Sequence, residues 1–209
     1  MIKIGIDFDN TIVSYDELMY RAALDRGLIN GGGERTKRAV RDRIRQMPDG
    51  EIEWQKLQAL VYGPMMTGAR PTEGAEEFIK WCRSSGLAVS IVSHKTEYAS
   101  YDVTRTNLRA AALDWMTARR FFDRDGLDIR REAVYFESTR ADKIARIRSI
   151  GCSHFIDDLE EVFLEESFPR DVHKILYSPG TPESPVEGST AAVLSSWGAI
   201  RELIAAGTP

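Results

Sequence analysis

The sequence predicts an α/β fold, a doubly wound parallel sheet of Rossmann-like type with a small α-helical cap inserted after its first strand. Alternating isoleucines at positions 2, 4 and 6 predict a short buried strand at the start of the chain. From residue 74 onward, apolar strand-like segments alternate with amphipathic helical segments. Between residues 14 and 70 the pattern is helical only. Alternating strands and helices favour parallel pairing through right-handed crossovers.

The core domain is predicted to comprise residues 1–13 and 71–209. After the strand over residues 2–6, further strands are expected over residues 87–92, 133–136, 154–156 and 172–177. Helices are expected over residues 76–83, 140–150, 159–166 and 196–205, with a mixed helical region over residues 96–122. The helices should therefore cover both faces of the sheet.

The insert over residues 14–70 contains two apolar-striped segments, residues 15–26 and 51–62, on either side of a basic stretch at residues 35–45. Because it follows the first strand directly, we expect it to cap the carboxyl edge of the sheet.

The composition limits the classes of function. A net charge of -4 over 209 residues argues against a general nucleic-acid binder, because such proteins use excess Lys and Arg to neutralise phosphates. No apolar run approaches the roughly 18 residues of a membrane span, and the polar, acidic start is not that of a signal peptide. Cys82 and Cys152 lack metal-site spacing and are expected to be small core residues. We predict a cytoplasmic protein with no membrane partner.

Two carboxylates, Asp7 and Asp9, follow the first strand. The carboxyl ends of the strands in an open α/β sheet are where ligands bind. Two like charges so close together are unfavourable unless a cation, a shared proton or hydrogen bonds hold them, which favours a functional site. The alternative is an ordinary Asp/Asn-rich turn.

Other polar side chains follow later strands. Ser93 ends one strand, with His94 and Lys95 directly behind it, and a second carboxylate pair, Asp157 and Asp158, ends another. Lys143 lies in the first turns of the predicted helix over residues 140–150, where the helix N-terminus favours an anion. Carboxylate oxygens with little His or Cys nearby favour Mg²⁺ over zinc.

Together these residues resemble the four ordered motifs of the haloacid dehalogenase superfamily of hydrolases. The resemblance covers residues 2 to about 160 and rests on Asp7-Phe8-Asp9-Asn10-Thr11, Ser93, Lys143 and Asp157-Asp158. It implies that Asp7 is the nucleophile and Asp9 the general acid, that Ser93 and Lys143 hold the phosphoryl oxygens, and that Mg²⁺ is the cofactor. The metal ligands implied are Asp7, the main-chain carbonyl of Asp9, Asp157 and Asp158. Members that cleave carbon–halogen or carbon–phosphorus bonds lack the acid at the position of Asp9, so the resemblance implies phosphate ester chemistry.

Five further residues are candidates for substrate binding: Asn10, Thr11, His94, Lys95 and Arg45. Thr11 is expected to orient the Asp7 loop, and Asn10 stands where family members often have Gly but tolerates left-handed backbone angles. Lys95 competes with Lys143 for the phosphoryl group. Arg45 belongs to a basic helix face that either grips a second anionic group or is simply solvated. His94 either meets the substrate or makes a structural hydrogen bond.

The function predicted is a Mg²⁺-dependent phosphomonoester hydrolase that acts through an aspartyl-phosphate on a small phosphorylated metabolite, such as a phosphosugar or nucleotide. One alternative is a phosphatase of nucleotides or nucleic-acid ends, helped by the basic stretch. Another is a phosphate-binding regulatory module without turnover.

Overall fold

A computed structural model describes residues 2–180 and 191–207. The chain divides into two compact units. The first comprises Met1–Val13, Pro71–Lys95 and Arg119–Pro209, and the second comprises Ser14–Arg70 and Thr96–Ala118. The sequence pattern assigned residues 96–118 to the core domain, whereas the structure groups them with the inserted helices. The reason is local packing, because the Trp115 indole is buried and donates a hydrogen bond to the carbonyl of Ala69 at 2.9 Å.

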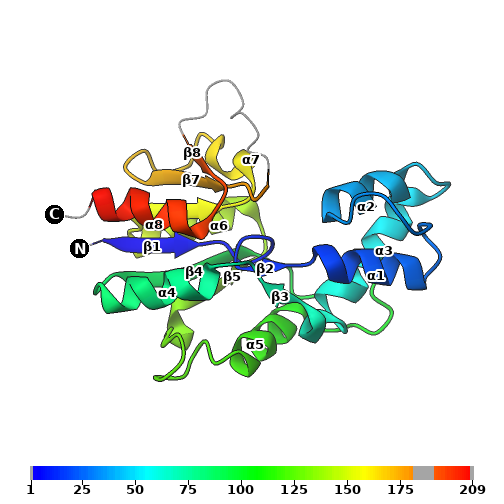
Figure 1. The fold of residues 1–209 in the computed structure, drawn as a ribbon, viewed down its shortest axis with the longest axis horizontal. Helices are drawn as coiled ribbons and strands as arrows, with labels where there is room; N and C mark the ends of the chain where they lie inside the picture. The colour runs from blue at the N-terminus through cyan, green and yellow to red at the C-terminus, as the bar shows by residue number, and fades with distance from the viewer. Residues whose placement is uncertain (1, 181–190, 208–209) are drawn as a thin grey trace. The chain divides into compact units, whose positions relative to one another are not determined.

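The first unit is built on a six-stranded sheet whose strand pairs are all parallel (Figure 1). Its strand order is β5-β4-β1-β6-β7-β8. The predicted fold class is therefore confirmed. The strands are β1 (Lys3–Ile6), β4 (Ala88–His94), β5 (Val134–Glu137), β6 (His154–Asp157), β7 (His173–Tyr177) and β8 (Ala192–Leu194).

The strand order reverses next to β1. From β1 the chain builds outward through β4 and β5 on one side, and then returns to add β6, β7 and β8 on the other. In the register, Ile6 of β1 lies beside Ile91 of β4 and Ile156 of β6. The carboxyl ends of β1 and β6 therefore lie side by side at the switch point, the position where ligands bind in open α/β sheets.

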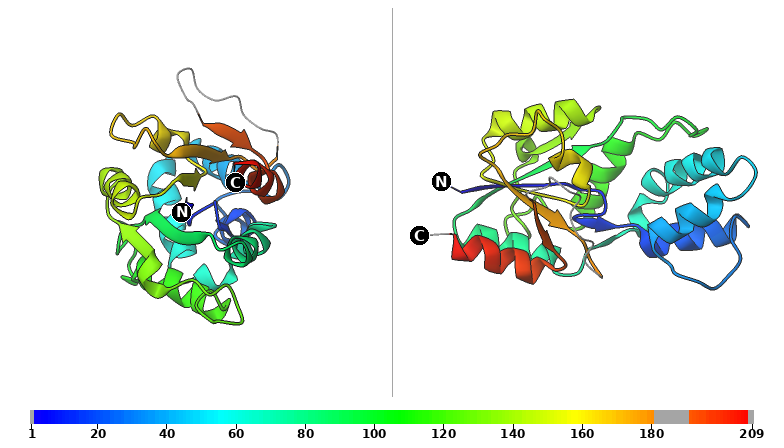
Figure 2. Two further views of the ribbon diagram at one scale, coloured as in Figure 1. Left: turned by 90° about the vertical axis from the view of Figure 1, so that its left-hand side faces the viewer. Right: turned by 90° about the horizontal axis from the view of Figure 1, so that it is seen from above.

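Helices cover both faces of this sheet (Figure 2). On one face α4 and α8 pack together, with the rings of Phe78 and Trp197 5.0 Å apart. On the other face Phe155 packs against apolar residues of α6 and α7, among them Ile144 and Phe163. The helices are α4 (Ala75–Ser84), α6 (Arg140–Ile150), α7 (Glu160–Phe163) and α8 (Trp197–Ala206).

Helix boundaries in the first unit follow from capping chemistry. The hydroxyl of Thr139 accepts a hydrogen bond from the Asp142 amide at the start of α6, and Ser196 does the same for Ala199 at the start of α8. Helix α6 ends at Ile150 and is capped by Gly151, whose φ of 66° suits a glycine. Strand β8 is not predicted from the sequence, because three half-buried residues carry too little alternation to indicate a strand.

The second unit is helical and also includes a short 3-10 turn, η1 (Met66–Gly68). Its helices are α1 (Asp16–Asp25), α2 (Lys37–Arg45), α3 (Gly50–Tyr62) and α5 (Leu108–Ala118). Helices α1, α2 and α3 pack on one another around Met19, Ile44 and Leu57, which are fully buried. Two of the four passages of the chain between the units run through two-residue strands, β2 (Val13–Ser14) and β3 (Arg70–Pro71), which pair with each other. No helix within residues 2–180 and 191–207 has the length and apolar character needed to cross a bilayer.

Gly5 lies in the middle of β1, opposite Phe155 of β6. A Cβ at this position would lie 2.5 Å from Cδ2 of Phe155 and 2.7 Å from Sγ of Cys152. We expect Gly5→Ala to lower the free energy of unfolding by about 1–3 kcal/mol, because the added methyl overfills a packed core. Chemical denaturation measures the change. Gly198→Ala is the matched control, since its Cβ would meet nothing closer than 3.8 Å. Equal stability of the two variants would contradict the prediction.

Candidate active site

The loop that follows β1 is held by main-chain hydrogen bonds. The amide of Asp7 donates to the carbonyl of Ile156 at 2.9 Å, so the end of β1 is fixed to β6. The Phe8 carbonyl accepts from the amides of Ile12 and Val13, each at 3.0 Å. Asn10 has a φ of 61°, the left-handed conformation that its side chain was expected to tolerate. The turn therefore presents Asp7 and Asp9 from a defined backbone.

Three carboxylates converge at the switch point. One oxygen each of Asp7, Asp157 and Asp158 lies within 4.8 Å of the others. Asp7 follows β1 and Asp157 ends β6, so the neighbouring strands bring together residues 150 positions apart. The Asp9 carboxylate does not belong to this group.

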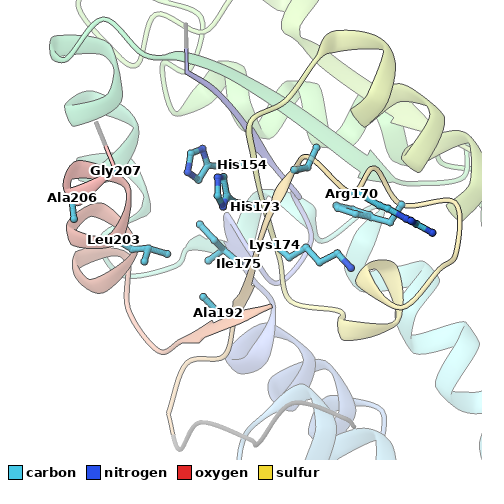
Figure 3. Close-up of a pocket in the computed structure, with 11 residues that line it drawn as sticks. His154, Arg170, His173, Lys174, Ile175, Ala192, Leu203, Ala206 and Gly207 are labelled. Atoms are coloured by element: carbon cyan, nitrogen blue, oxygen red, sulfur yellow. The ribbon is translucent and has the colours of Figure 1, made fainter. Parts of the chain in front are cut away.

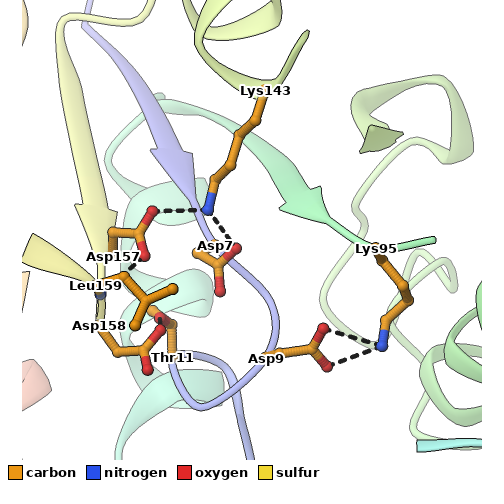
Figure 4. A network of polar contacts seen from close by, with 8 residues as sticks. All are labelled: Asp7, Asp9, Thr11, Lys95, Lys143, Asp157, Asp158 and Leu159. Carbon is orange, nitrogen blue, oxygen red and sulfur yellow. Dashed lines mark hydrogen bonds and ion pairs between the residues drawn. The ribbon is translucent and has the colours of Figure 1, made fainter. Parts of the chain in front are cut away.

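Lys143 lies between two of these carboxylates (Figure 4). Its Nζ donates to Oδ1 of Asp7 at 2.6 Å and to Oδ2 of Asp157 at 2.7 Å. Helix α6 carries it from its first turn, and only 1% of the residue is exposed. Burial would lower the pKa of Lys143, but the charges of Asp157 and Asp7 outweigh burial and raise it, so this lysine stays protonated.

The environment of Asp7 disfavours the charged form of its carboxyl group. Burial raises the pKa of its carboxyl well above the ordinary value; Lys143 opposes this effect, whereas the carboxylates of Asp157, Asp158 and Asp9 add to it. The hydrogen bond from Lys143 occupies Oδ1 and leaves Oδ2 without a hydrogen bond among the described residues. A cation bound among the three carboxylates would offset their mutual repulsion.

Asp9 has a lysine of its own. The ammonium of Lys95 contacts both carboxylate oxygens, Oδ1 at 3.0 Å and Oδ2 at 2.9 Å (Figure 4). The sequence left open which of Lys95 and Lys143 holds the phosphoryl group. In the structure each lysine pairs with a different carboxylate of the loop, and it is Lys143 that contacts Asp7.

Ser93 and His94 end β4 with different environments. Ser93 is 1% exposed, and its hydroxyl has no hydrogen-bond partner among the described residues. A buried hydroxyl without a partner is unfavourable unless a ligand satisfies it. His94 is exposed, and its Nε2 lies 3.0 Å from the carbonyl oxygen of Ser138. This contact agrees with one of the two roles considered for His94 from the sequence, a structural hydrogen bond.

Thr11 is tied to Asp158 and to a buried network. Its hydroxyl donates to Oδ1 of Asp158 at 3.4 Å. Its carbonyl accepts from the hydroxyl of Thr72 at 2.6 Å, and that hydroxyl accepts from the indole of Trp197 at 2.9 Å. The sequence gives no signal for this network, because Thr72 reads as part of a loop and Trp197 as an ordinary core residue.

Arg45 lies in the second unit, on the exposed face of α2. Its guanidinium pairs with Glu51 at 2.6 Å, so it already has a carboxylate partner. The neighbouring Arg43 donates to the carbonyls of Gly32 and Asn30 at 2.9 and 2.6 Å, which ties down the glycine-rich loop before α2. These contacts favour the reading of a solvated, structural basic face.

A cavity of about 760 Å³ lies elsewhere in the first unit, at the amino ends of β6 and β7 (Figure 3). It is lined by residues that include His154, Arg170, His173 and Leu203. None of the predicted site residues lines this cavity. The cavity is therefore separate from the carboxylate group at the switch point.

No protein-family model matches the chain, and no curated protein does either. Solved structures do match it over nearly its whole length. A haloacid dehalogenase-like hydrolase from Streptococcus pneumoniae has a TM-score of 0.63 at 12% identity and covers 100% of this chain and 99% of its own. A HAD family hydrolase from Deinococcus radiodurans R1, with bound phosphate and sodium, has a TM-score of 0.57 at 18% identity and covers 98% and 95%. A predicted phosphoglycolate phosphatase from Haemophilus somnus has a TM-score of 0.56 at 14% identity and covers 97% of each chain.

At identities this low, the likeness to these structures shows the architecture alone. The resemblance inferred from the motifs is confirmed at the level of the fold. The chain has the fold of the haloacid dehalogenase-like hydrolases.

Proposed function

We propose that the protein is a Mg²⁺-dependent phosphomonoester hydrolase of the haloacid dehalogenase type, acting on a small phosphorylated metabolite. The observation that carries the proposal is the convergence of Asp7, Asp157 and Asp158 at the switch point, with the Lys143 ammonium between two of them. The hydrolases and the predicted phosphoglycolate phosphatase that share this fold support this proposal.

The carboxylate group fits a magnesium ion. Its three oxygens within 4.8 Å of one another are hard ligands of the kind Mg²⁺ prefers, and the described residues offer no His or Cys in that group. Burial and, to a smaller extent, the neighbouring carboxylates raise the pKa of Asp7, and a divalent cation would offset both effects. Asp7, Asp157 and Asp158 would hold the ion, together with the main-chain carbonyl of Asp9. When bound, the ion would neutralise charge on the phosphoryl oxygens.

Asp7 is the proposed nucleophile. Its Oδ2 attacks phosphorus, the bond from phosphorus to the leaving oxygen breaks, and an aspartyl-phosphate forms. Asp9 donates a proton to the leaving oxygen and then takes one from the attacking water. Water adds to phosphorus and releases inorganic phosphate, which restores the Asp7 carboxylate.

Ser93 and Lys143 are proposed to bind the phosphoryl oxygens. The unpartnered Ser93 hydroxyl can donate to one of them, and Lys143 offers a permanent positive charge beside Asp7. Such fixed donors stabilise charge that builds up in the transition state. Thr11 would position Asp158 through their hydrogen bond.

Asp9 distinguishes this proposal from carbon–halogen cleavage, because the dehalogenating members that the sequence resembles lack an acid there. The substrate class rests on the resemblance, which favours phosphosugars and nucleotides. A cap of the kind predicted for residues 14–70 closes around small ligands and excludes water.

The metal requirement tests the proposal directly. We expect hydrolysis of p-nitrophenyl phosphate and of a panel of phosphosugars and nucleotides in the presence of Mg²⁺. EDTA should abolish the activity and added Mg²⁺ should restore it, because the three carboxylates repel a phosphate unless a cation lies between them. Phosphate release measures the rate. Absence of hydrolysis across the panel, despite saturable binding of inorganic phosphate, would favour a binding module instead.

A further inference from the structure

We propose that Thr72 is a positioning residue that anchors the end of the turn after β1, residues 7–13, to the layer formed by α4 and α8. The inference rests on the proposed function, since its consequence is a change in the rate of phosphate release. Thr72 lies between β3 and α4 and belongs to none of the four motifs. Two of its groups bind the main chain of the turn.

Thr72 contacts two consecutive carbonyls of the turn. Its amide donates to the carbonyl of Ile12 at 2.8 Å, and its hydroxyl donates to the carbonyl of Thr11 at 2.6 Å. Thr11 is fully buried, and Thr72 is buried as well. A buried carbonyl that loses its donor is unfavourable, so the place of Thr11 beside Thr72 is strongly defined.

Trp197 determines the direction in which the Thr72 hydroxyl donates. Its indole is 1% exposed and donates to the Thr72 oxygen at 2.9 Å. An indole N–H can only donate, so the hydroxyl accepts from it, and its own single hydrogen is left for the turn. That hydrogen goes to Thr11, because the hydroxyl lies farther from the carbonyl of Ile12, at 3.3 Å. Trp197 begins α8 and packs on Phe78 of α4, which connects the contact to both helices.

Other hydrogen bonds determine the shape of the turn rather than its place in the unit. The two bonds to the Phe8 carbonyl lie within the turn. The Asp7 amide, which donates to β6, fixes where the turn begins. Thr72 fixes where it ends, and Asp9 lies between the two anchors. A displacement of a reacting group by about 1 Å can lower a rate on the order of 100-fold.

The proposed phosphate-binding residues lie on other elements. Ser93 is near the end of β4, and Lys143 belongs to α6. A displaced turn should therefore lower kcat and leave the inhibition constant of inorganic phosphate unchanged. Distortion of the phosphate site itself would raise that constant as well.

The test removes the hydroxyl of Thr72 and keeps the shape of the side chain. For the phosphosugar or nucleotide that wild type hydrolyses fastest, we expect Thr72→Val to lower kcat by about 10- to 100-fold. The KM for this substrate and the inhibition constant of inorganic phosphate should stay within about threefold of wild type. Thr72→Ser keeps the hydroxyl, so its kcat should also stay within about threefold of wild type. Every variant is assayed at a temperature at which circular dichroism shows it to be folded.

Ser153→Ala is the matched control. The Ser153 hydroxyl donates to the carbonyl of Lys3 at 3.1 Å and accepts from its amide at 3.0 Å. It therefore also bonds to the main chain of β1, but at the end opposite to the turn. Its loss should lower the stability of the unit without changing kcat.

Trp197→Phe gives a second test of the same role. It keeps an aromatic ring and removes the bond that orients the Thr72 hydroxyl, so kcat should fall by about 3- to 10-fold. In a Thr72→Val background the same change should lower kcat by less than about twofold, because no hydroxyl remains to be oriented. If Thr72→Val does not fold, Trp197→Phe alone decides.

The outcomes separate this inference from the proposed function. A wild-type kcat in Thr72→Val, or in Trp197→Phe where Thr72→Val does not fold, overturns the positioning role and leaves the phosphatase proposal standing. A Thr72→Ser variant as slow as Thr72→Val does the same, and so does an equal loss of kcat from Ser153→Ala. A wild-type protein that hydrolyses no ester of the panel with Mg²⁺ removes both proposals.

Discussion

Asp7→Asn is expected to reduce phosphate release by on the order of 10⁴-fold or more, because it removes the proposed nucleophile. The amide has nearly the same shape as the carboxylate, and its oxygen can still accept the hydrogen bond that Lys143 donates to Oδ1 at 2.6 Å. The fold should therefore survive the change. Activity is measured as phosphate release from the panel with saturating Mg²⁺, and folding by circular dichroism.

The control for this variant is Asp128→Asn in the same unit. Asp128 is exposed, pairs with Arg83 at 3.3 Å and has a φ of 55°, which Asn tolerates as Asp does. Asp128→Asn makes the same chemical change as Asp7→Asn, but at a residue outside the proposed active site, so the rate of phosphate release should not change. If Asp7→Asn retained more than about a tenth of the wild-type rate, covalent catalysis by Asp7 would be ruled out.

Lys143→Met is expected to lower the free energy of unfolding by about 3–5 kcal/mol in the absence of metal, the usual effect of removing one partner of a buried ion pair. The ammonium is the neighbour that offsets the burial of Asp7 and also donates to Asp157, whose side chain is 0% exposed. Activity should fall as well, because the variant lacks the cation proposed to hold the phosphoryl group. Chemical denaturation with EDTA present measures the stability.

Added Mg²⁺ gives this prediction a second readout. A divalent cation among the carboxylates replaces the missing positive charge, so Mg²⁺ should raise the midpoint of thermal unfolding more in Lys143→Met than in wild type. Lys174→Met is the control, because it removes a lysine whose partner is a carbonyl rather than a carboxylate. If Lys143→Met were as stable as wild type, with or without Mg²⁺, the prediction would be wrong. Repulsion among the buried carboxylates would then not lower the stability of the fold.

The sequence was sufficient for five of the six strands of the sheet, all but β8, and for bringing the carboxylates to one edge of it. Carboxylates at strand ends are informative because parallel strands bring their carboxyl ends to one edge, so Asp7 and Asp157 could be placed together although they are far apart in the chain. The assignment of each lysine to a partner could not be derived in this way. Lys95 and Lys143 are both close to strand ends, and only side-chain direction decides that one meets Asp9 and the other Asp7.

The region over residues 96–122 shows a different limit. It was predicted as mixed helix, but α5 occupies only Leu108–Ala118. Before it, the Asp102 carboxylate accepts hydrogen bonds from the amides of Thr104 and Thr106 at 2.8 and 2.5 Å. Such local bonds from a side chain to the backbone compete with helix formation, and composition alone does not show which will prevail.

A chain of hydrogen bonds runs from Trp197, at the start of α8, through Thr72 to Thr11. Helix α8 therefore supports the candidate site although it contributes no residue to it. A shortened protein that stops before α8 would keep every motif residue yet lose the indole that anchors the Thr72 hydroxyl. Fragments designed around the motifs alone should therefore extend through Ala206, the end of α8.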